Sequence, residues 1–194
     1  MALAKKEEYY TYADYLEWDT EERYELIDGV PYMMSPAPTP THQRISAAFT
    51  RLFGNYLRGK TCEVFAAPFD VRLNADEEDD TVVQPDILII CDKTKIDDRG
   101  CKGAPDLVIE IVSKSSGNYD RGLKLHKYIN AGVRECWIVD PDDKIVQVYI
   151  LQADRSANML TYHAEDTVPV SILQDLRIPL PEVFAGVTDR HSPA

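Results

Sequence analysis

Apolar residues along this chain fall mostly into short runs that predict β-strands. Two of these runs, residues 82–91 and 105–112, are aliphatic at positions of either parity, so we expect strands that are covered on both faces. The dipeptide Asp28-Gly29 separates two shorter runs and predicts a tight hairpin turn. Further strands are expected at residues 23–27, 30–34, 61–65, 69–73, 135–139, 144–151, 159–164 and 168–172.

Other segments have helical signals at their ends. Thr11 with Asp14 three residues later has the spacing of a capping box. A loop with three prolines at residues 35–40 precedes the longest helical segment, and Gly132 is a typical helix stop signal. The expected helices cover about residues 11–18, 41–59, 120–131 and 179–184. Together with the strands they predict an α/β fold, a mixed twisted sheet flanked by helices.

The composition bounds the class of protein. With 194 residues, 44% of them hydrophobic, the chain suits one domain with a substantial core. It contains no run of 18 apolar residues, so we expect no membrane span. Its first eight residues lack the apolar core of a signal peptide, and we therefore expect a cytoplasmic protein.

The cysteines are expected to be free thiols. Cys62, Cys91, Cys101 and Cys136 lie far apart, and no Cys-x-x-Cys pair occurs. Cys62, Cys91 and Cys136 fall in strand-like runs, where a free cysteine behaves as a small apolar core residue.

Two acidic residues stand inside the two runs that we expect to be buried. Asp86 opens the first aliphatic stretch, and Glu110 nearly closes the second. Residues 92–104 contain charged residues and two glycines, which predicts a surface loop between neighbouring antiparallel strands. The start of one strand then faces the end of the other, and directly opposed residues lie about 5 Å apart at Cβ.

Burying two carboxylates side by side costs about several kcal/mol unless something compensates their charge. A divalent cation removes this cost, and oxygen ligands suit Mg²⁺ or Mn²⁺. The alternative is that each acid caps the end of a strand and points to water. We interpret Asp86 and Glu110 as a candidate metal site.

The charge distribution has two opposite implications. A net charge of −12 argues against loose, sequence-independent binding to nucleic acid. However, Arg44, Arg51 and Arg58 are spaced seven apart and share one stripe of the long helix, where they could hold phosphates. A plain solvated helix face is the alternative. The buried stripe of the same helix is expected to consist of Ile45, Phe49, Leu52 and Tyr56.

Several motifs in a fixed order resemble one known family. They are Tyr24-Glu25-Leu26-Ile27-Asp28-Gly29, Ser35-Pro36 with His42, Gln84-Pro85-Asp86, Ala104-Pro105-Asp106-Leu107-Val108-Ile109-Glu110, Tyr119-Asp120-Arg121-Gly122-Leu123-Lys124 and Trp137-Ile138-Val139-Asp140-Pro141. Pro85-Asp86 followed by Glu110 resembles the PD-(D/E)xK nuclease superfamily. The whole set, from about Thr11 to about Phe184, is similar to the Uma-two family of putative restriction endonucleases.

This resemblance implies a restriction-endonuclease-like fold, in a single domain of residues 1–194 with a core of about 11–184. It also implies an endonuclease that hydrolyses phosphodiester bonds in DNA and depends on Mg²⁺ or Mn²⁺. Asp86 and Glu110 would ligate the metal, with the backbone carbonyl of Ile111 as a third ligand.

The lysine of the superfamily motif is displaced in this chain. Val112 stands two residues after the glutamate, where the lysine is expected. Lys124 on the following helix would replace it by orienting the attacking water and offsetting phosphate charge, and Lys114 is a second candidate. A surface pair of Lys124 with Asp120 is the alternative.

Three further residues complete the candidate site. Glu25 matches the early acid of the family, which could hold a second metal or a water, or it could face solvent as a hairpin residue. His42 could contact phosphate or shuttle a proton, or it could make only a local hydrogen bond at the start of its helix. Gln84 could reach the same pocket. The predicted nucleic-acid contacts are therefore His42, Arg44, Arg51 and Gln84.

Two functional classes stay open. The first is an active nuclease, favoured by an acid pair inside apolar strands. The second is a catalytically silent module that binds nucleic acid or another protein, favoured by Val112 and by the acidic surface. By analogy with dimeric nucleases, a sheet edge at residues 144–164 could pair two copies as a homodimer.

Overall fold

The computed structural model of this chain describes residues 9–34, 37–75, 78–112 and 120–187, with the backbone alone for Asp120 and Arg121. Its helices are α1 (Tyr12–Tyr15), α2 (Pro40–Leu57), α4 (Leu125–Ala131) and α5 (Leu180–Val183). A π-helical segment, Asp120–Lys124, leads directly into α4. A 3₁₀ turn covers Lys93–Lys95.

A six-stranded central sheet has the order β12-β11-β10-β9-β6-β3. Its strands are β3 (Glu63–Ala66), β6 (Ile87–Ile90), β9 (Leu107–Ile111), β10 (Glu135–Asp140), β11 (Ile145–Leu151) and β12 (Ala157–His163). Strands β9 and β10 are parallel, whereas the other neighbours are antiparallel. The predicted mixed sheet is therefore confirmed.

A second sheet, which we call the side sheet, consists of shorter strands in the order β2-β1-β5-β4-β8-β7. They are β1 (Tyr24–Ile27), β2 (Val30–Met33), β4 (Val71–Arg72), β5 (Val82–Val83), β7 (Ile96–Asp97) and β8 (Gly100–Lys102). A separate antiparallel pair joins β13 (Thr167–Pro169) to β14 (Arg177–Pro179).

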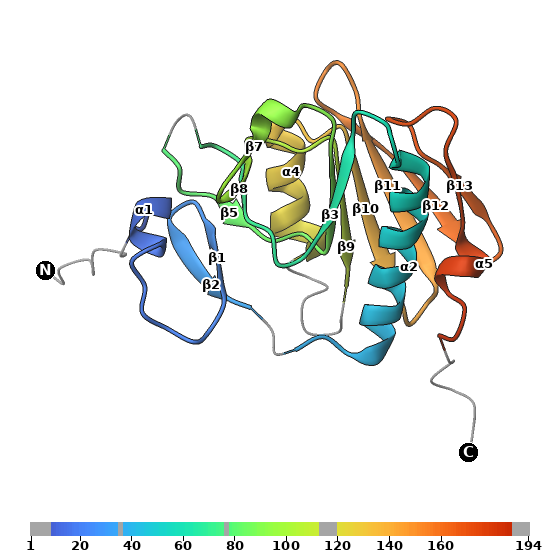
Figure 1. Cartoon of the computed structure of the whole chain (residues 1–194), viewed down its shortest axis with the longest axis horizontal. Helices are drawn as coiled ribbons and strands as arrows, with labels where there is room; N and C mark the ends of the chain where they lie inside the picture. The colour runs from blue at the N-terminus through green and yellow to red at the C-terminus, as the bar shows by residue number, and fades with distance from the viewer. Residues whose placement is uncertain (1–8, 35–36, 76–77, 113–119, 188–194) are drawn as a thin grey trace, which may run out of the picture.

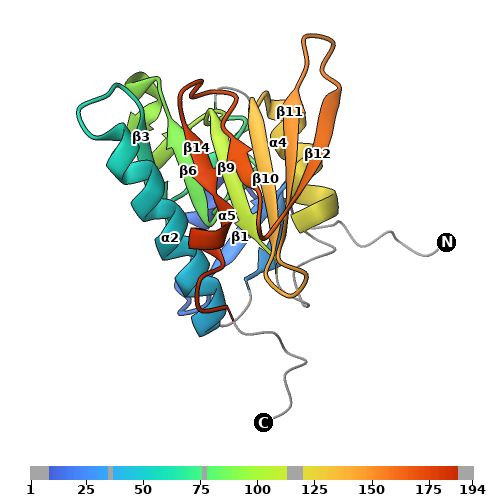
Figure 2. The ribbon, with the colours of Figure 1, turned by 90° about the vertical axis from the view of Figure 1, so that its right-hand side faces the viewer.

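The helices cover opposite faces of the central sheet. Helices α2 and α5 lie in front of its strands in Figure 2, together with β14. On the other face lie α4 and the side sheet, with the β1–β2 hairpin at the far left of Figure 1. This arrangement leaves α4 between the two sheets, which positions it to carry site residues inward.

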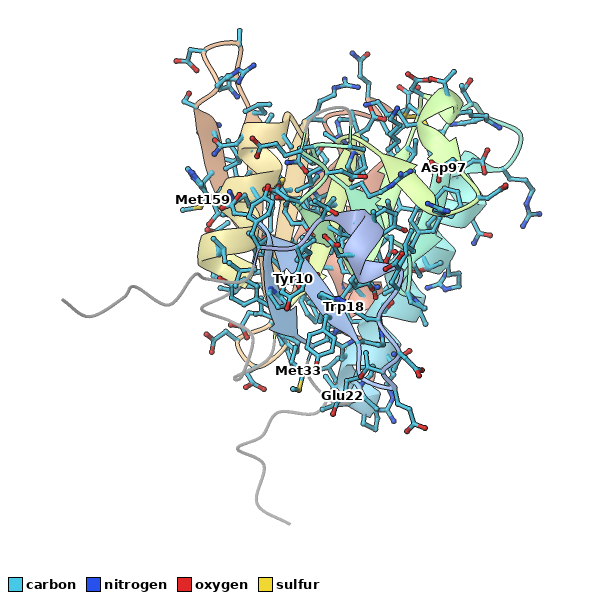
Figure 3. The ribbon with its side chains drawn as sticks, turned by 90° about the vertical axis from the view of Figure 1, so that its left-hand side faces the viewer. Tyr10, Trp18, Glu22, Met33, Asp97 and Met159 are labelled. Atoms are coloured by element: carbon cyan, nitrogen blue, oxygen red, sulfur yellow. A yellow bond between two sulfur atoms is a disulfide. The ribbon has the colours of Figure 1, made fainter. Side chains whose placement is uncertain are left out.

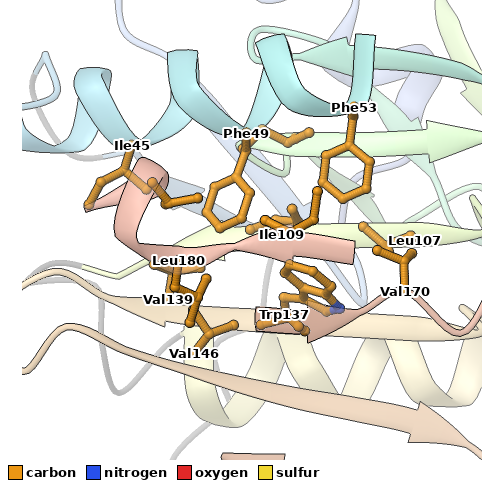
Figure 4. Packing of buried hydrophobic residues seen from close by; sticks show 14 of the residues in the cluster. Ile45, Phe49, Phe53, Leu107, Ile109, Trp137, Val139, Val146, Val170 and Leu180 are labelled. Atoms are coloured by element: carbon orange, nitrogen blue, oxygen red, sulfur yellow. The ribbon is translucent and has the colours of Figure 1, made fainter. Parts of the chain in front are cut away.

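The larger core fills the α2 face. Ile45, Phe49 and Phe53 of α2 point toward Ile109 of β9 and Trp137 of β10 (Figure 4), and all five side chains are fully buried. Leu57 completes the buried stripe, whereas Leu52 and Tyr56 are only partly buried. The second half of the predicted stripe was thus wrong. With 3.6 residues per turn, the positions of α2 that face the sheet after Phe49 are those of Phe53 and Leu57.

A second core fills the α4 face. Leu88 and Ile90 of β6 and Val108 of β9 pack with Leu125 and Tyr128 of α4. Residues of the side sheet complete this cluster, among them Ile27, Val71 and Val83. Because side chains alternate along a strand, even-numbered residues of β6 and β9 face α4, and odd-numbered ones face α2.

The local turn and cap signals mostly act as predicted. Thr11 and Asp14 form a capping box, although α1 ends at Tyr15 rather than near Trp18. Asp28 and Gly29 both have positive φ, 51° and 74°, as a two-residue hairpin turn requires. Trp18 makes edge contacts with several tyrosines beside the hairpin (Figure 3), so it packs as part of a small aromatic cluster.

The predicted strand at residues 82–91 is wrong, because it is two strands in different sheets. β5 pairs with β1 and β4 in the side sheet, whereas β6 lies in the central sheet. Pro85 lies between them and has no N–H to continue a ladder. The amide of Gln84 donates to the Glu25 carboxylate instead.

The predicted surface loop at residues 92–104 is also wrong in part. This segment contains the β7–β8 hairpin, in which Gly100 and Cys101 are buried. The Cys101 amide donates to the Asp70 carbonyl, and a Cβ added to Gly100 would lie 2.2 Å from that oxygen. The glycine therefore marks a close approach of two backbone segments and not an exposed turn.

The expectation of free thiols is wrong for two of the cysteines. Cys62 and Cys91 form a disulfide, and the antiparallel register of β3 and β6 sets these two positions opposite each other. Cys101 and Cys136 are free, as predicted, and both are buried, although Cys101 was expected in a surface loop. In the described residues no helix is long and apolar enough to cross a membrane.

Candidate active site

A buried lysine joins two glutamates from different sheets. Nζ of Lys124 lies 2.7 Å from Oε1 of Glu110 and 2.8 Å from Oε1 of Glu25. None of these three side chains is more than 5% exposed. Lys124 is therefore not a surface residue, and Glu25 does not face solvent.

The fold brings the three residues together from distant parts of the chain. Glu110 is an even-numbered residue of β9 and so faces α4. Glu25 lies two residues before Ile27 on β1, and both point from the side sheet toward this same face. Lys124 ends the π-helical segment directly before α4, which lies between the two sheets.

Tyr128 is a further neighbour of Glu110. It lies one helical turn after Lys124 and is fully buried. Its hydroxyl donates to Oε1 of Glu110 at 2.5 Å. Burial raises the pKa of Tyr128 well above its ordinary value, and the nearby Glu110 charge raises it further. The sequence analysis missed this residue, although its spacing of four from Lys124 was a usable signal.

Asp86 is the second member of the ligand pair that the sequence predicted. The register sets Ile87 opposite Ile109 and Leu88 opposite Val108, so its continuation by one residue sets Asp86 opposite Glu110. The predicted antiparallel pairing of these two strands is confirmed. Asp86 keeps partial exposure, with 20% of its side chain accessible.

The Asp86 carboxylate is held at both of its oxygens. Oδ2 accepts a hydrogen bond from the amide of Ile111 at 2.7 Å. Oδ1 lies 3.1 Å from Nε2 of His42. The His42 amide also donates to the Thr39 hydroxyl, so this histidine both belongs to the helix cap and contacts the site.

Gln84 lies next to the site and forms hydrogen bonds with its neighbours. Its backbone amide donates to Oε1 of Glu25 at 2.8 Å. Its side chain donates to Oδ1 of Asp70 at 2.7 Å and accepts from Arg23. Gln84 is 8% exposed, so its role in this structure is to position Glu25 within a buried network.

The predicted arginine stripe lies apart from this cluster. Arg44 and Arg51 are exposed on α2, and Arg58 is exposed directly after its end, as both readings of the sequence allowed. Arg51 forms an ion pair with Glu182 of α5 at 3.3 Å. Lys114, the second candidate for the site lysine, falls outside the described residues.

The donor atoms suit a hard divalent cation. Glu25 and Glu110 share one ammonium group, that of Lys124, and Asp86 adds a further carboxylate opposite Glu110 by strand register. No group of three or more His, Cys, Asp or Glu side chains close enough to hold a metal occurs in the part of the chain described. Mg²⁺ commonly uses only one or two protein carboxylates, with waters and substrate phosphates as its other ligands. Asp86 and Glu110, which the register of β6 and β9 sets opposite each other, stay the predicted pair of ligands.

Comparisons with known proteins agree with one another. A sequence model of the Uma2 family, described as "Putative restriction endonuclease", matches residues 12–181. "Uncharacterized protein slr1290" of Synechocystis sp. (strain ATCC 27184 / PCC 6803 / Kazusa) is 28% identical over 155 residues, which cover 79% of this chain and 73% of that protein.

The fold also matches a solved structure. A crystal structure described as a putative nuclease belonging to DUF820, from Anabaena variabilis ATCC 29413, superposes with a TM-score of 0.74 and 20% identity. The match covers 92% of this chain and 99% of that one. The restriction-endonuclease-like α/β fold expected from the sequence is thus confirmed.

Proposed function

The chain belongs to the Uma2 family, and from this premise we propose that it is an endonuclease that hydrolyses phosphodiester bonds in DNA with Mg²⁺ or Mn²⁺. One observation supports the proposal most. Glu110 of the central sheet lies opposite Asp86 and directly contacts the buried ammonium of Lys124. Carboxylates can hold the ion for this hydrolysis, and a lysine beside them can stabilise charge on the phosphate.

Each group would have a separate role that follows from its position. Asp86, Glu110 and the backbone carbonyl of Ile111 would hold the ion. When bound, the ion would lower the pKa of a water and neutralise charge on the phosphate. Lys124 would orient the attacking water and stabilise negative charge that develops on the phosphoryl oxygens.

The neighbouring groups set the position and charge of these residues. Glu25 also contacts the ammonium of Lys124, at 2.8 Å, and the amide of Gln84 fixes Glu25. His42 contacts Asp86 at the partly exposed edge of the site, where it would meet a phosphate. Arg44 and Arg51 on the exposed face of α2 would contact the DNA backbone further away.

Plasmid nicking tests this proposal. Purified protein is incubated with supercoiled DNA and Mg²⁺ or Mn²⁺, beside Asp86→Ala and Glu110→Ala. The matched control is Glu165→Ala, which removes an exposed carboxylate in the turn after β12. We expect nicking by the wild type and the control and a loss of at least about 10²-fold in both site variants. Equal nicking by all four proteins would indicate a contaminant and contradict the proposal.

A catalytically silent module is the second candidate, and one observation favours it. Val112 occupies the position of the superfamily lysine and is buried, with its amide bonded to the Val139 carbonyl. A silent module would bind DNA equally with and without the ion and would leave it intact. Gel-shift and nicking assays on the same samples separate the two functions.

We also propose a homodimer through β12, the outer strand of the central sheet. Its residues Ala157–His163 carry no aspartate, glutamate, lysine or arginine, and Met159 (Figure 3) and Leu160 are 47% and 40% exposed. Natural proteins usually protect such an edge with charges. Light scattering of the wild type and Leu160→Lys tests this: a dimer that the lysine dissociates supports it, and a wild-type monomer contradicts it.

A further inference from the structure

Tyr128 is a buried hydroxyl group that the proposed reaction does not yet use. Its ring packs on the α4 face among Leu88, Val108 and Leu125, and no part of it is exposed. Phenylalanine would fill the same space. A buried tyrosine hydroxyl requires a hydrogen-bond partner, and here that partner is Glu110.

Two donors from one helix turn converge on a single carboxylate oxygen. Oε1 of Glu110 lies 2.5 Å from the Tyr128 hydroxyl and 2.7 Å from Nζ of Lys124. The residues are four apart, so both project from the same side of the segment that leads into α4. Together they fix the rotation of the carboxylate on its strand.

The two donors differ in charge and in their other contacts. Lys124 carries a charge and also contacts Glu25, so its ammonium is shared between two glutamates. Tyr128 carries no charge, and its fully buried hydroxyl donates to Glu110. It therefore holds the Glu110 carboxylate without adding charge, whereas Lys124 brings the positive charge that the proposed chemistry uses.

We propose that Tyr128 is a positioning residue, which orients the Glu110 carboxylate for the divalent ion. The inference rests on the proposed function, because it assumes that Glu110 is a ligand. Groups that hydrogen-bond to metal ligands typically contribute 10- to 100-fold to metal affinity, since they fix the ligand before the ion arrives.

Direct measurement of Mn²⁺ affinity tests this without an activity assay. Tyr128→Phe removes one oxygen atom and keeps the ring. We expect its Mn²⁺ dissociation constant, from isothermal titration calorimetry, to rise about 10- to 100-fold over the wild type. Circular dichroism checks folding, and the titration is run below the melting temperature of both proteins, so that lower stability cannot imitate weaker binding.

Tyr12→Phe is the matched control. Tyr12 is 2% exposed, and its hydroxyl also donates to a carboxylate, Oδ2 of Asp70, at 3.0 Å. It packs in a different cluster, against Leu26 and Val82. The control thus loses the same kind of bond without contact to a proposed metal ligand, since Asp70 is linked to the site through Gln84, and its Mn²⁺ affinity is expected to stay within about twofold of the wild type.

The outcomes separate this inference from the proposed function. Wild-type binding with an unchanged affinity in Tyr128→Phe would overturn the positioning role and leave the metal site standing. An equal loss in Tyr128→Phe and Tyr12→Phe would assign the effect to general loosening and also overturn it. Absence of Mn²⁺ binding by the wild type would overturn both proposals together.

Discussion

Two glutamates on neighbouring strands have opposite surroundings. Glu110 of β9 and Glu135 of β10 are 3% and 0% exposed, and their strands run parallel. Glu110 faces α4, whereas Glu135 faces the α2 side, where Trp137 lies. By burial alone the two residues could not be told apart.

Their partners distinguish them. Glu135 accepts hydrogen bonds from the Trp137 indole N–H at 2.8 Å and the Ile172 amide at 3.1 Å. These donors are fixed parts of the core and of a loop, so Glu135 ties the loop to the sheet. Glu110 is instead contacted by the tips of two side chains, Lys124 and Tyr128, one of them charged. A buried carboxylate with a cation beside it is suited to chemistry, and one held by backbone and indole is suited to structure.

Removal of the buried ammonium should have the largest effect. We expect Lys124→Met to abolish nicking and to lower the free energy of unfolding by about 3–5 kcal/mol, because it leaves two buried carboxylates without their cation. Urea unfolding measures this. The control is Lys127→Met on the same helix, whose ammonium pairs with the exposed Asp28 and should contribute less than about 1 kcal/mol. Equal losses in the two variants would contradict the assignment.

Glu135→Gln should have the next largest effect on the free energy of unfolding and no effect on metal binding. The amide side chain turns a hydrogen-bond donor toward the indole and backbone donors, which should cost about 1–3 kcal/mol. Its Mn²⁺ affinity should equal that of the wild type, whereas Glu110→Gln should bind Mn²⁺ at least about tenfold more weakly. If the metal site weakened as much in Glu135→Gln, the contrast between the two glutamates would be lost.

The pH dependence of stability should sharpen the same contrast. Burial raises the pKa of Glu135 above its ordinary value of 4.5. The folded state therefore binds this proton more tightly than the unfolded state does, so the contribution is full below about pH 4.5 and is lost as the pH rises through the folded-state pKa. The difference in unfolding free energy between wild type and Glu135→Gln should shrink from pH 4.5 to 7. A difference that stays constant would show that Glu135 does not titrate in this range.

Disruption of an exposed ion pair should have the smallest effect on stability. Glu182 and Arg51 form an ion pair in which each side chain is 53% exposed. We expect Arg51→Gln to change the free energy of unfolding by less than about 1 kcal/mol, because solvent screens the pair. If Arg51 contacts phosphate, the same variant should reduce the salt dependence of DNA binding by about one unit of slope. An unchanged slope would remove Arg51 from the interface.

The parts of the fold that local chemistry determines could be predicted from the sequence. The Asp28-Gly29 turn and the Thr11 cap each act within four residues, and Gly132 ends α4 with a φ of 92°. The opposition of Asp86 and Glu110 also followed from one assumption, the antiparallel pairing of two adjacent strands.

The rest depended on contacts between distant segments. Pro85 divides two strands that go to different sheets, and the register of β3 with β6 pairs Cys62 with Cys91. Glu135 opens an apolar strand, as Asp86 does, so the sequence argument for buried acids could have selected it too. Only the positions of α4 and of the loop near Ile172 show which glutamate meets a lysine and which meets backbone amides.

The central claim is that Asp86 and Glu110 hold a divalent ion, and anomalous diffraction from crystals soaked in MnCl₂ tests it most directly. The account predicts one manganese peak bonded to carboxylate oxygens of both residues at about 2.0–2.2 Å, and no peak in Glu110→Gln crystals. A wild-type map without a peak there, or with manganese bound only by other residues, would contradict it.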